Sequence, residues 1–159
     1  MSLRPFALSL IAAITLIGCG KGAQNPSALG CELPEKLQAL SGTYADKDIG
    51  INKLGKHIGN STLTITVDND GVIEGSLRWS SSSHQGHTKE GELTSSDTEN
   101  VIGLIHPQTC EIGLAEYGET GSYRGRYRAD GAIELLLIQS GEAPVVIRNT
   151  YRRQTTKTN

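Results

Sequence analysis

The chain lacks several features that mark common classes of enzyme and membrane protein. Its main apolar run, Phe6 to Ile17, is too short to span a bilayer, which takes roughly 20 residues. It has no Gly-x-Ser-x-Gly nucleophile elbow, no phosphate-binding loop and no dinucleotide fingerprint. Its net charge is only −2 at pH 7, so no nucleic-acid partner is expected. These absences predict no catalytic residues and no cofactor, and therefore a protein that is not an enzyme.

The apolar run has the order of a secretory leader. Arg4 gives a positive start, and the run ends at Leu16-Ile17-Gly18-Cys19. These four residues resemble the lipobox of bacterial lipoproteins. The resemblance implies that Cys19 becomes the first mature residue and that its sulfur carries a diacylglycerol, with acyl chains such as palmitate in the membrane. The alternatives are an ordinary leader with a coincidental cysteine, or a short buried helix.

The lipobox resemblance also implies a location and a division of the chain. Residues 1–18 would be the signal peptide, residues 19–30 a lipidated tether, residues 31–152 the folded domain and residues 153–159 a flexible tail. Stable anchoring takes two acyl chains, which lipoprotein-type acylation supplies. Since no aspartate follows Cys19, the resemblance favours the bacterial outer membrane, with the domain facing the periplasm or the cell surface.

Two cysteines remain once Cys19 is assigned to lipid. In an exported domain, Cys31 and Cys110 are expected to form a disulfide. The alternatives are two free thiols or a catalytic cysteine, and an oxidising compartment favours neither.

Short apolar stretches between turn residues predict an all-β domain. Thr62 to Val67 alternates strictly, Asp68-Asn69-Asp70-Gly71 is a hairpin signal, and Val72 to Trp79 returns. About eight such strands predict an antiparallel meander closed as a small barrel, with a β-sandwich as the alternative. One short N-terminal helix is expected over Leu33 to Leu40, and a loop over Ile49 to Asn60.

Two predictions concern the second half of the chain. Lys89 to Leu93 and Asn100 to His106 are expected to pair as a hairpin around Ser95-Ser96-Asp97. Ile133 to Ile138 is apolar on both faces, which predicts a central strand that is covered on both sides.

The order of elements also resembles the small lipocalin-like barrels. A short helix leads into Gly42-Thr43-Tyr44, a meander follows, and an arginine, Arg148 or Arg152, lies near the last strand. The family usually has tryptophan at the place of Tyr44. The resemblance implies that Tyr44 packs under the helix and that the arginine covers it.

Three arginines are the main candidates for ligand binding. Arg124, Arg126 and Arg128 alternate along one predicted strand, so they share a face, and Arg148 or Arg78 could join them from neighbouring strands. Such a strip would suit an anionic ligand, lipid headgroups or an acidic partner. The alternative is a solvated face on which the arginines pair with glutamates such as Glu134.

Aromatic and histidine residues supply weaker candidates. Trp79, Tyr123 and Tyr127 are the large aromatic residues in predicted strands, where they could line a cavity or simply fill the core. His84 and His87 could begin a metal site, but the set of ligands is incomplete. No metal is predicted, and a solvated loop is the alternative.

Together these features favour a membrane-anchored, non-enzymatic binding or interaction module, for example of the inhibitor or immunity type. Its partner would be another envelope protein or a small amphipathic molecule. One alternative is a lipocalin-like carrier of a small apolar ligand, which would need an interior cavity of roughly 300 Å³ or more. Another is a metal-dependent enzyme that uses His84 and His87.

Overall fold

A computed structural model describes residues 31–81, 87–89, 92–94, 96–142 and 144–155, with the backbone alone for 87–89 and 92–94. Its strands are β1 (Gly42–Asp46), β2 (Ile49–Asn52), β3 (Gly55–Val67), β4 (Val72–Ser81), β5 (His87–Lys89), β6 (Glu92–Thr94), β7 (Ser96–Ile105), β8 (Glu111–Glu116), β9 (Gly121–Tyr127), β10 (Ile133–Gln139) and β11 (Val145–Arg153). A 3-10 helix, η2, covers Leu37–Leu40. No helix within these residues has the length and apolar character needed to cross a membrane.

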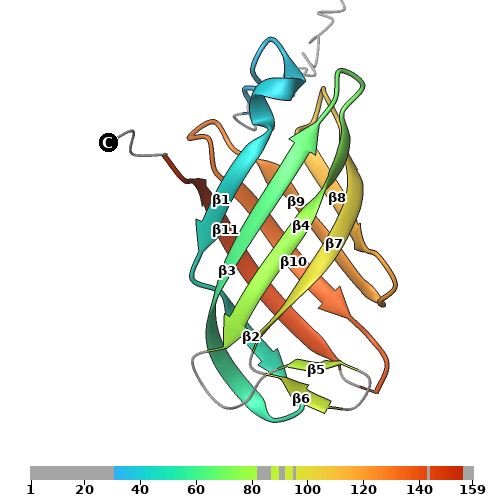
Figure 1. Cartoon of the computed structure of the whole chain (residues 1–159). Coiled ribbons are helices and arrows are strands. Elements are labelled where there is room, and N and C mark those ends of the chain that lie inside the picture. The colour runs from blue at the N-terminus through green and yellow to red at the C-terminus, as the bar shows by residue number, and fades with distance from the viewer. Residues whose placement is uncertain (1–30, 82–86, 90–91, 95, 143, 156–159) are drawn as a thin grey trace, which may run out of the picture.

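The strands form a closed antiparallel barrel (Figure 1). The neighbours run β1-β11-β10-β9-β8-β7-β4-β3, and β3 pairs back with β1. Strand β2 lies between β11 and β3 as β1 does, but further along the barrel. We call each strand position in the barrel wall a stave, so β1 and β2 together form one interrupted stave. Strands β5 and β6 pair only with each other, near the end of the barrel opposite η2. The predicted all-β barrel is confirmed, with eight staves and one extra strand.

The β3–β4 hairpin follows the sequence pattern closely. Leu63, Ile65 and Val67 point inward and are at most 4% exposed. The turn closes at Gly71, whose φ of 83° favours glycine. The carboxylate of Asp68 accepts hydrogen bonds from the backbone N–H groups of Asp70 and Val72, at 2.9 and 2.8 Å. Alternation and turn chemistry therefore agree, which sets the register of the pair.

One end of the barrel is covered by the segment that precedes β1. The structure joins Cys31 to Cys110 in a disulfide with a Cα–Cα distance of 5.8 Å. The hydroxyl of Tyr44 donates to the carbonyl of Leu40 at 2.7 Å, which ties η2 to β1. The guanidinium of Arg153 donates to Tyr44 Oη at 2.8 Å and lies 5.1 Å from the ring centroid.

This is the tyrosine–arginine contact that the lipocalin-like resemblance implies, but the arginine is neither Arg148 nor Arg152. Strand β11 continues through Arg153, one residue beyond the expected end of the domain, and so brings that residue to Tyr44.

Two predicted elements are wrong in the N-terminal part of the described chain. The expected helix shrinks to the four residues of η2, since a segment this short forms no stable α-helix alone. Residues 49–60 form β2 and the first part of β3 rather than a loop. Their inward positions carry Gly50, His57 and Gly59, so no apolar alternation reveals the strands.

Two predictions about the second half also fail. Ser96 and Asp97 begin β7, which pairs with β4 and β8, whereas β5 pairs with β6. Strand β10 is not covered on both sides, since Leu136 is 39% exposed and Ile138 is 47% exposed. The reason is that a barrel wall has one inner face and one outer face, and here the outer face meets solvent.

Candidate functional site

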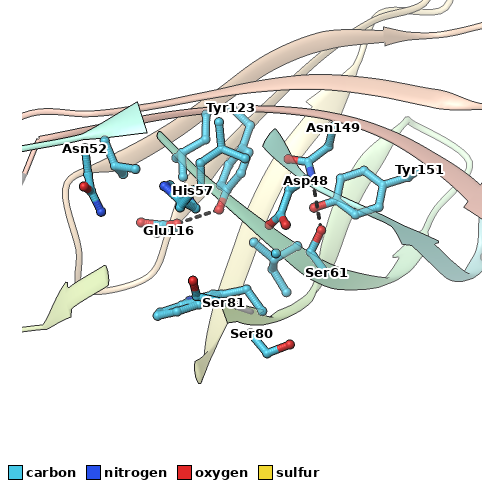
Figure 2. A pocket seen from close by; sticks show the side chains of 16 residues that line it. Asp48, Asn52, His57, Ser61, Ser80, Ser81, Glu116, Tyr123, Asn149 and Tyr151 are labelled. Carbon is cyan, nitrogen blue, oxygen red and sulfur yellow. Dashed lines mark hydrogen bonds between the residues drawn. The ribbon is translucent and has the colours of Figure 1, made fainter. Parts of the chain in front are cut away.

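The barrel interior is polar at the end opposite η2. Inward positions there carry hydrogen-bonding side chains, and one more comes from the break between β1 and β2 (Figure 2): Asp48, His57, Ser61, Glu116, Tyr123, Asn149 and Tyr151. Together with apolar side chains such as Leu77, Leu137 and Val145, they enclose a cavity of about 30 Å³. We call this space the polar cavity. Its volume suits a water-sized molecule.

Asp48 enters the cavity where the stave of β1 and β2 is interrupted. Its backbone carbonyl accepts the N–H of Gly59 at 3.2 Å, and its side chain is only 4% exposed. Residue 59 has to be glycine here, because a Cβ at that position would lie 2.7 Å from the Ser80 carbonyl oxygen and would also meet the Asp48 carboxylate. Burial raises the pKa of the Asp48 carboxyl to about 6, and the charge of Asp46 adds to this rise.

Two hydrogen bonds tie the cavity wall together across strands (Figure 2). Tyr123 Oη donates to Glu116 Oε1 at 2.6 Å, linking β9 to β8. Burial, together with the nearby Glu116, raises the pKa of Tyr123 well above its usual value. Asn149 Nδ2 donates to Ser61 Oγ at 3.0 Å, linking β11 to β3. These two bonds satisfy part of the wall only, since Asp48 Oδ1 is buried with no hydrogen-bond partner among the described residues. The space between these groups is too small for a carried ligand.

The raised pKa of Asp48 predicts a pH-dependent stability. The folded state keeps the Asp48 proton up to about pH 6, whereas the unfolded chain releases it at lower pH. The free energy of unfolding that this proton contributes is therefore complete below the unfolded pKa and is lost as pH rises through about 6. A pKa that differs by one between the folded and unfolded states is worth about 1.4 kcal/mol. Screening by nearby solvent reduces the effect. We therefore expect Asp48→Asn to raise the free energy of unfolding by about 1 to 2 kcal/mol at pH 7.5.

Urea unfolding at pH 4.5 and pH 7.5 measures this effect. The gain from Asp48→Asn should be small at pH 4.5. Asp70→Asn, at an exposed turn position, is the matched control and should change neither value. An equal gain at both pH values would contradict the assignment to the Asp48 charge.

The predicted aromatic residues divide between the cavity and the core. Trp79 and Tyr123 line the polar cavity, whereas Tyr127 is half-buried and packs against the apolar core. Sequence reasoning missed Asp48 and Glu116, two of the buried carboxylates and the two that line the cavity. Strand alternation alone gives no sign that an inward position is acidic.

The predicted arginine strip lies on the outer wall and is also divided. Arg126 Nε lies 3.5 Å from Glu134 Oε2. Arg128 forms ion pairs with Glu134 and with Asp130, the latter at 3.3 Å. Arg124, by contrast, takes part in no salt bridge within the described part of the chain.

Three other predicted residues cannot be placed. Cys19 and His84 lie outside the described residues, and the side chain of His87 does too. Within the ranges that the structure does describe, no group of three or more His, Cys, Asp or Glu side chains could hold a metal ion.

The closed barrel of eight antiparallel staves fits the lipocalin-like resemblance. No protein-family model matches the chain, and no curated protein matches it. A solved structure, the S-type phycobiliprotein lyase CPES from Guillardia theta, is similar to it at 11% identity and a TM-score of 0.42. The match covers 74% of this chain and 89% of that one.

This match corrects one expectation. The prediction that the chain is not an enzyme is contradicted, because the matched protein is named as a lyase, and we withdraw it. At 11% identity, neither the activity nor the substrate of that protein is carried over to this chain.

Proposed function

We propose that the chain is a lipid-anchored interaction module of the bacterial envelope, which binds a partner protein through the outer wall of its barrel. The observation that carries this proposal is a group of outward apolar side chains on β2, β10 and β11. They are between 39% and 58% exposed: Ile49, Ile51, Leu136, Ile138 and Val146. We call this group the outer apolar patch.

Strand register supports treating the patch as one surface. Val146 lies between Ile51 and Ile138 in the ladder, because it pairs with both. Neighbouring strands are only about 4.8 Å apart, so these three side chains adjoin. Contiguous exposed apolar side chains are typical of protein-binding surfaces.

The interior gives less support to the alternative of a carrier. An apolar ligand of ordinary size needs a cavity of roughly 300 Å³ or more, whereas the polar cavity measures about 30 Å³. Its lining includes Asp48 and Glu116, which would be poor neighbours for an apolar ligand. A partner held on the outer wall needs no opening of the barrel. An inhibitor or immunity-type role would be one form of this function.

The anchor in this proposal is Cys19, through the lipobox resemblance. The tether of residues 19–30 would join it to Cys31, which is bonded to Cys110 at the barrel end covered by η2. Attached at one end, the barrel would leave its side wall accessible to proteins in the same compartment.

Cross-linking in intact cells that carry the full chain tests both parts of the proposal. The wild type should stay in the membrane fraction and yield a cross-linked envelope protein by affinity purification and mass spectrometry. Cys19→Ser should move to the soluble fraction. Ile138→Asp with Val146→Asp should remain on the membrane but lose most of the cross-linked partner, because charge on the patch prevents its burial.

Tyr117→Asp is the matched control, since Tyr117 is 69% exposed and lies outside the patch. It should retain the partner. Membrane retention of Cys19→Ser would remove the anchor from the proposal. Equal recovery of the partner with the patch variant and the control would remove the patch.

A further inference from the structure

A row of outward residues crosses five adjacent strands beside the outer apolar patch. Register places these residues in one line from β7 to β11: Leu104, Gly113, Arg124, Leu136 and Arg148. We call this line the arginine row. Charged and apolar side chains alternate toward β11, where Leu136 lies between Arg124 and Arg148. At the other end of the row, Gly113 separates Arg124 from Leu104.

The outer wall is hollowed along this row. One groove of about 430 Å³ is lined by Leu136, Arg148 and their neighbours, and another of about 740 Å³ by Leu104 and Gly113. The linings of the two grooves share Glu111, Arg124 and Gly125, so the grooves adjoin at β8 and β9. Gly113 keeps the passage open, since no atom lies within 4 Å of the place where its Cβ would be.

Among the residues that the structure describes, the charges along the groove leave two arginines without an acidic partner. Glu134 is engaged by Arg126 and Arg128. Glu111 lines both grooves, where it accepts a hydrogen bond from Thr109 Oγ1 at 3.2 Å and forms no salt bridge among the described residues. Asp70, the remaining acid of the groove lining, borders only the part of the groove that contains Leu104.

Arg124 and Arg148 form no salt bridge among the described residues. The middle of the row is therefore positively charged as well as apolar, which suits an acidic ligand with an apolar side chain.

We infer that the arginine row binds an extended acidic segment of the partner protein, with carboxylates on Arg124 and Arg148 and an apolar side chain on Leu136. This inference rests on the proposed function. The two arginines stand two strands apart, which is roughly 10 Å. Residues two or three apart in an extended chain span roughly 7 to 10 Å, so two acidic side chains with that spacing can reach both guanidinium groups.

Two other occupants fit this surface less well. A second copy of the chain, joined face to face, would bring the same arginines of both copies together, and like charges in contact are unfavourable. A membrane is flat on this scale, whereas the row runs along a groove in the curved wall across five of the eight staves. A flexible polypeptide can follow such a groove.

A photo-cross-linking residue at position 122 tests the inference in intact cells with the full chain. Ser122 is exposed and lies two residues from Arg124 on the same face of β9. Mass spectrometry of the cross-linked product should identify a protein segment with at least two Asp or Glu residues around an apolar residue. A segment without acidic residues, a lipid adduct, a second copy of the chain or no product would each overturn the inference.

Charge reversal provides the quantitative measure. Arg124→Glu with Arg148→Glu should reduce the cross-linked product at least about tenfold, because like charges then face the acidic segment. Gly113→Leu should also reduce it by filling the groove without changing the charge. The matched control is Arg78→Glu with Arg152→Glu, two exposed arginines of the barrel outside the groove, which should retain the product. Equal loss in the control would overturn the inference.

A second probe at position 51 separates this inference from the proposed function. Ile51 belongs to the outer apolar patch but not to the arginine row. A protein product from position 51, with none from position 122, would leave the interaction module in place and remove the acidic segment. No protein product from either position would remove both.

Discussion

Cys31→Ser and Cys110→Ser should each lower the free energy of unfolding by about 4 kcal/mol, by the chain-entropy estimate for a closed loop of this length. The disulfide joins residues 79 positions apart, so its loss releases most of the barrel sequence from one constraint in the unfolded state. Cys110 is fully buried between two backbone hydrogen bonds, one to the His106 carbonyl and one from the Tyr127 N–H, both 2.9 Å. The bridge therefore fastens the segment before β1 to a rigid part of the barrel.

Urea unfolding of the two single variants and the double variant measures this loss. Because both single variants break the same bond, their losses should agree to within about 1 kcal/mol, and the double variant should add little. Reduction of the wild type should give a similar loss. Single losses that add up in the double variant would mean that the two cysteines act independently, and the disulfide would be excluded.

The parts of the fold that sequence predicts best are those in which adjacent residues carry the whole signal. Strands β3 and β4 alternate, and Asp68 and Gly71 supply the turn chemistry between them. The start of β3 fails for the opposite reason. Its inward residues His57 and Gly59 pack against Gly50 and Asp48, which come from another segment. Their pattern therefore makes sense only after the strands are paired.

The candidate surfaces show the same limit. Alternation correctly places Arg124, Arg126 and Arg128 on one face, but it cannot tell which of them is neutralised. That depends on Glu134 lying opposite Arg126 and on Leu136 lying between Arg124 and Arg148. Register across strands is a long-range property, and no local pattern contains it. The buried position of Asp48 likewise depends on how β2 closes the barrel.

Gly125→Ala should destabilise the barrel by about 3 kcal/mol or more, at the upper end of what overpacking costs. Gly125 lies on the inner side of β9, opposite Leu135 of β10. A Cβ there would lie 1.7 Å from the Glu134 carbonyl oxygen and 2.9 Å from Leu135 Cα. Both are backbone atoms, so no side chain can rotate away, and β9 and β10 would have to separate.

Gly113→Ala is the matched control for this substitution. Gly113 lies on the neighbouring strand β8, faces outward and has nothing within 4 Å of its Cβ position, so its replacement should change stability by less than about 0.5 kcal/mol. Urea unfolding compares the two variants directly. If Gly125→Ala proved as stable as Gly113→Ala, β9 and β10 would not approach this closely. The register that places Arg124 beside Leu136 would then be wrong, and with it the arginine row.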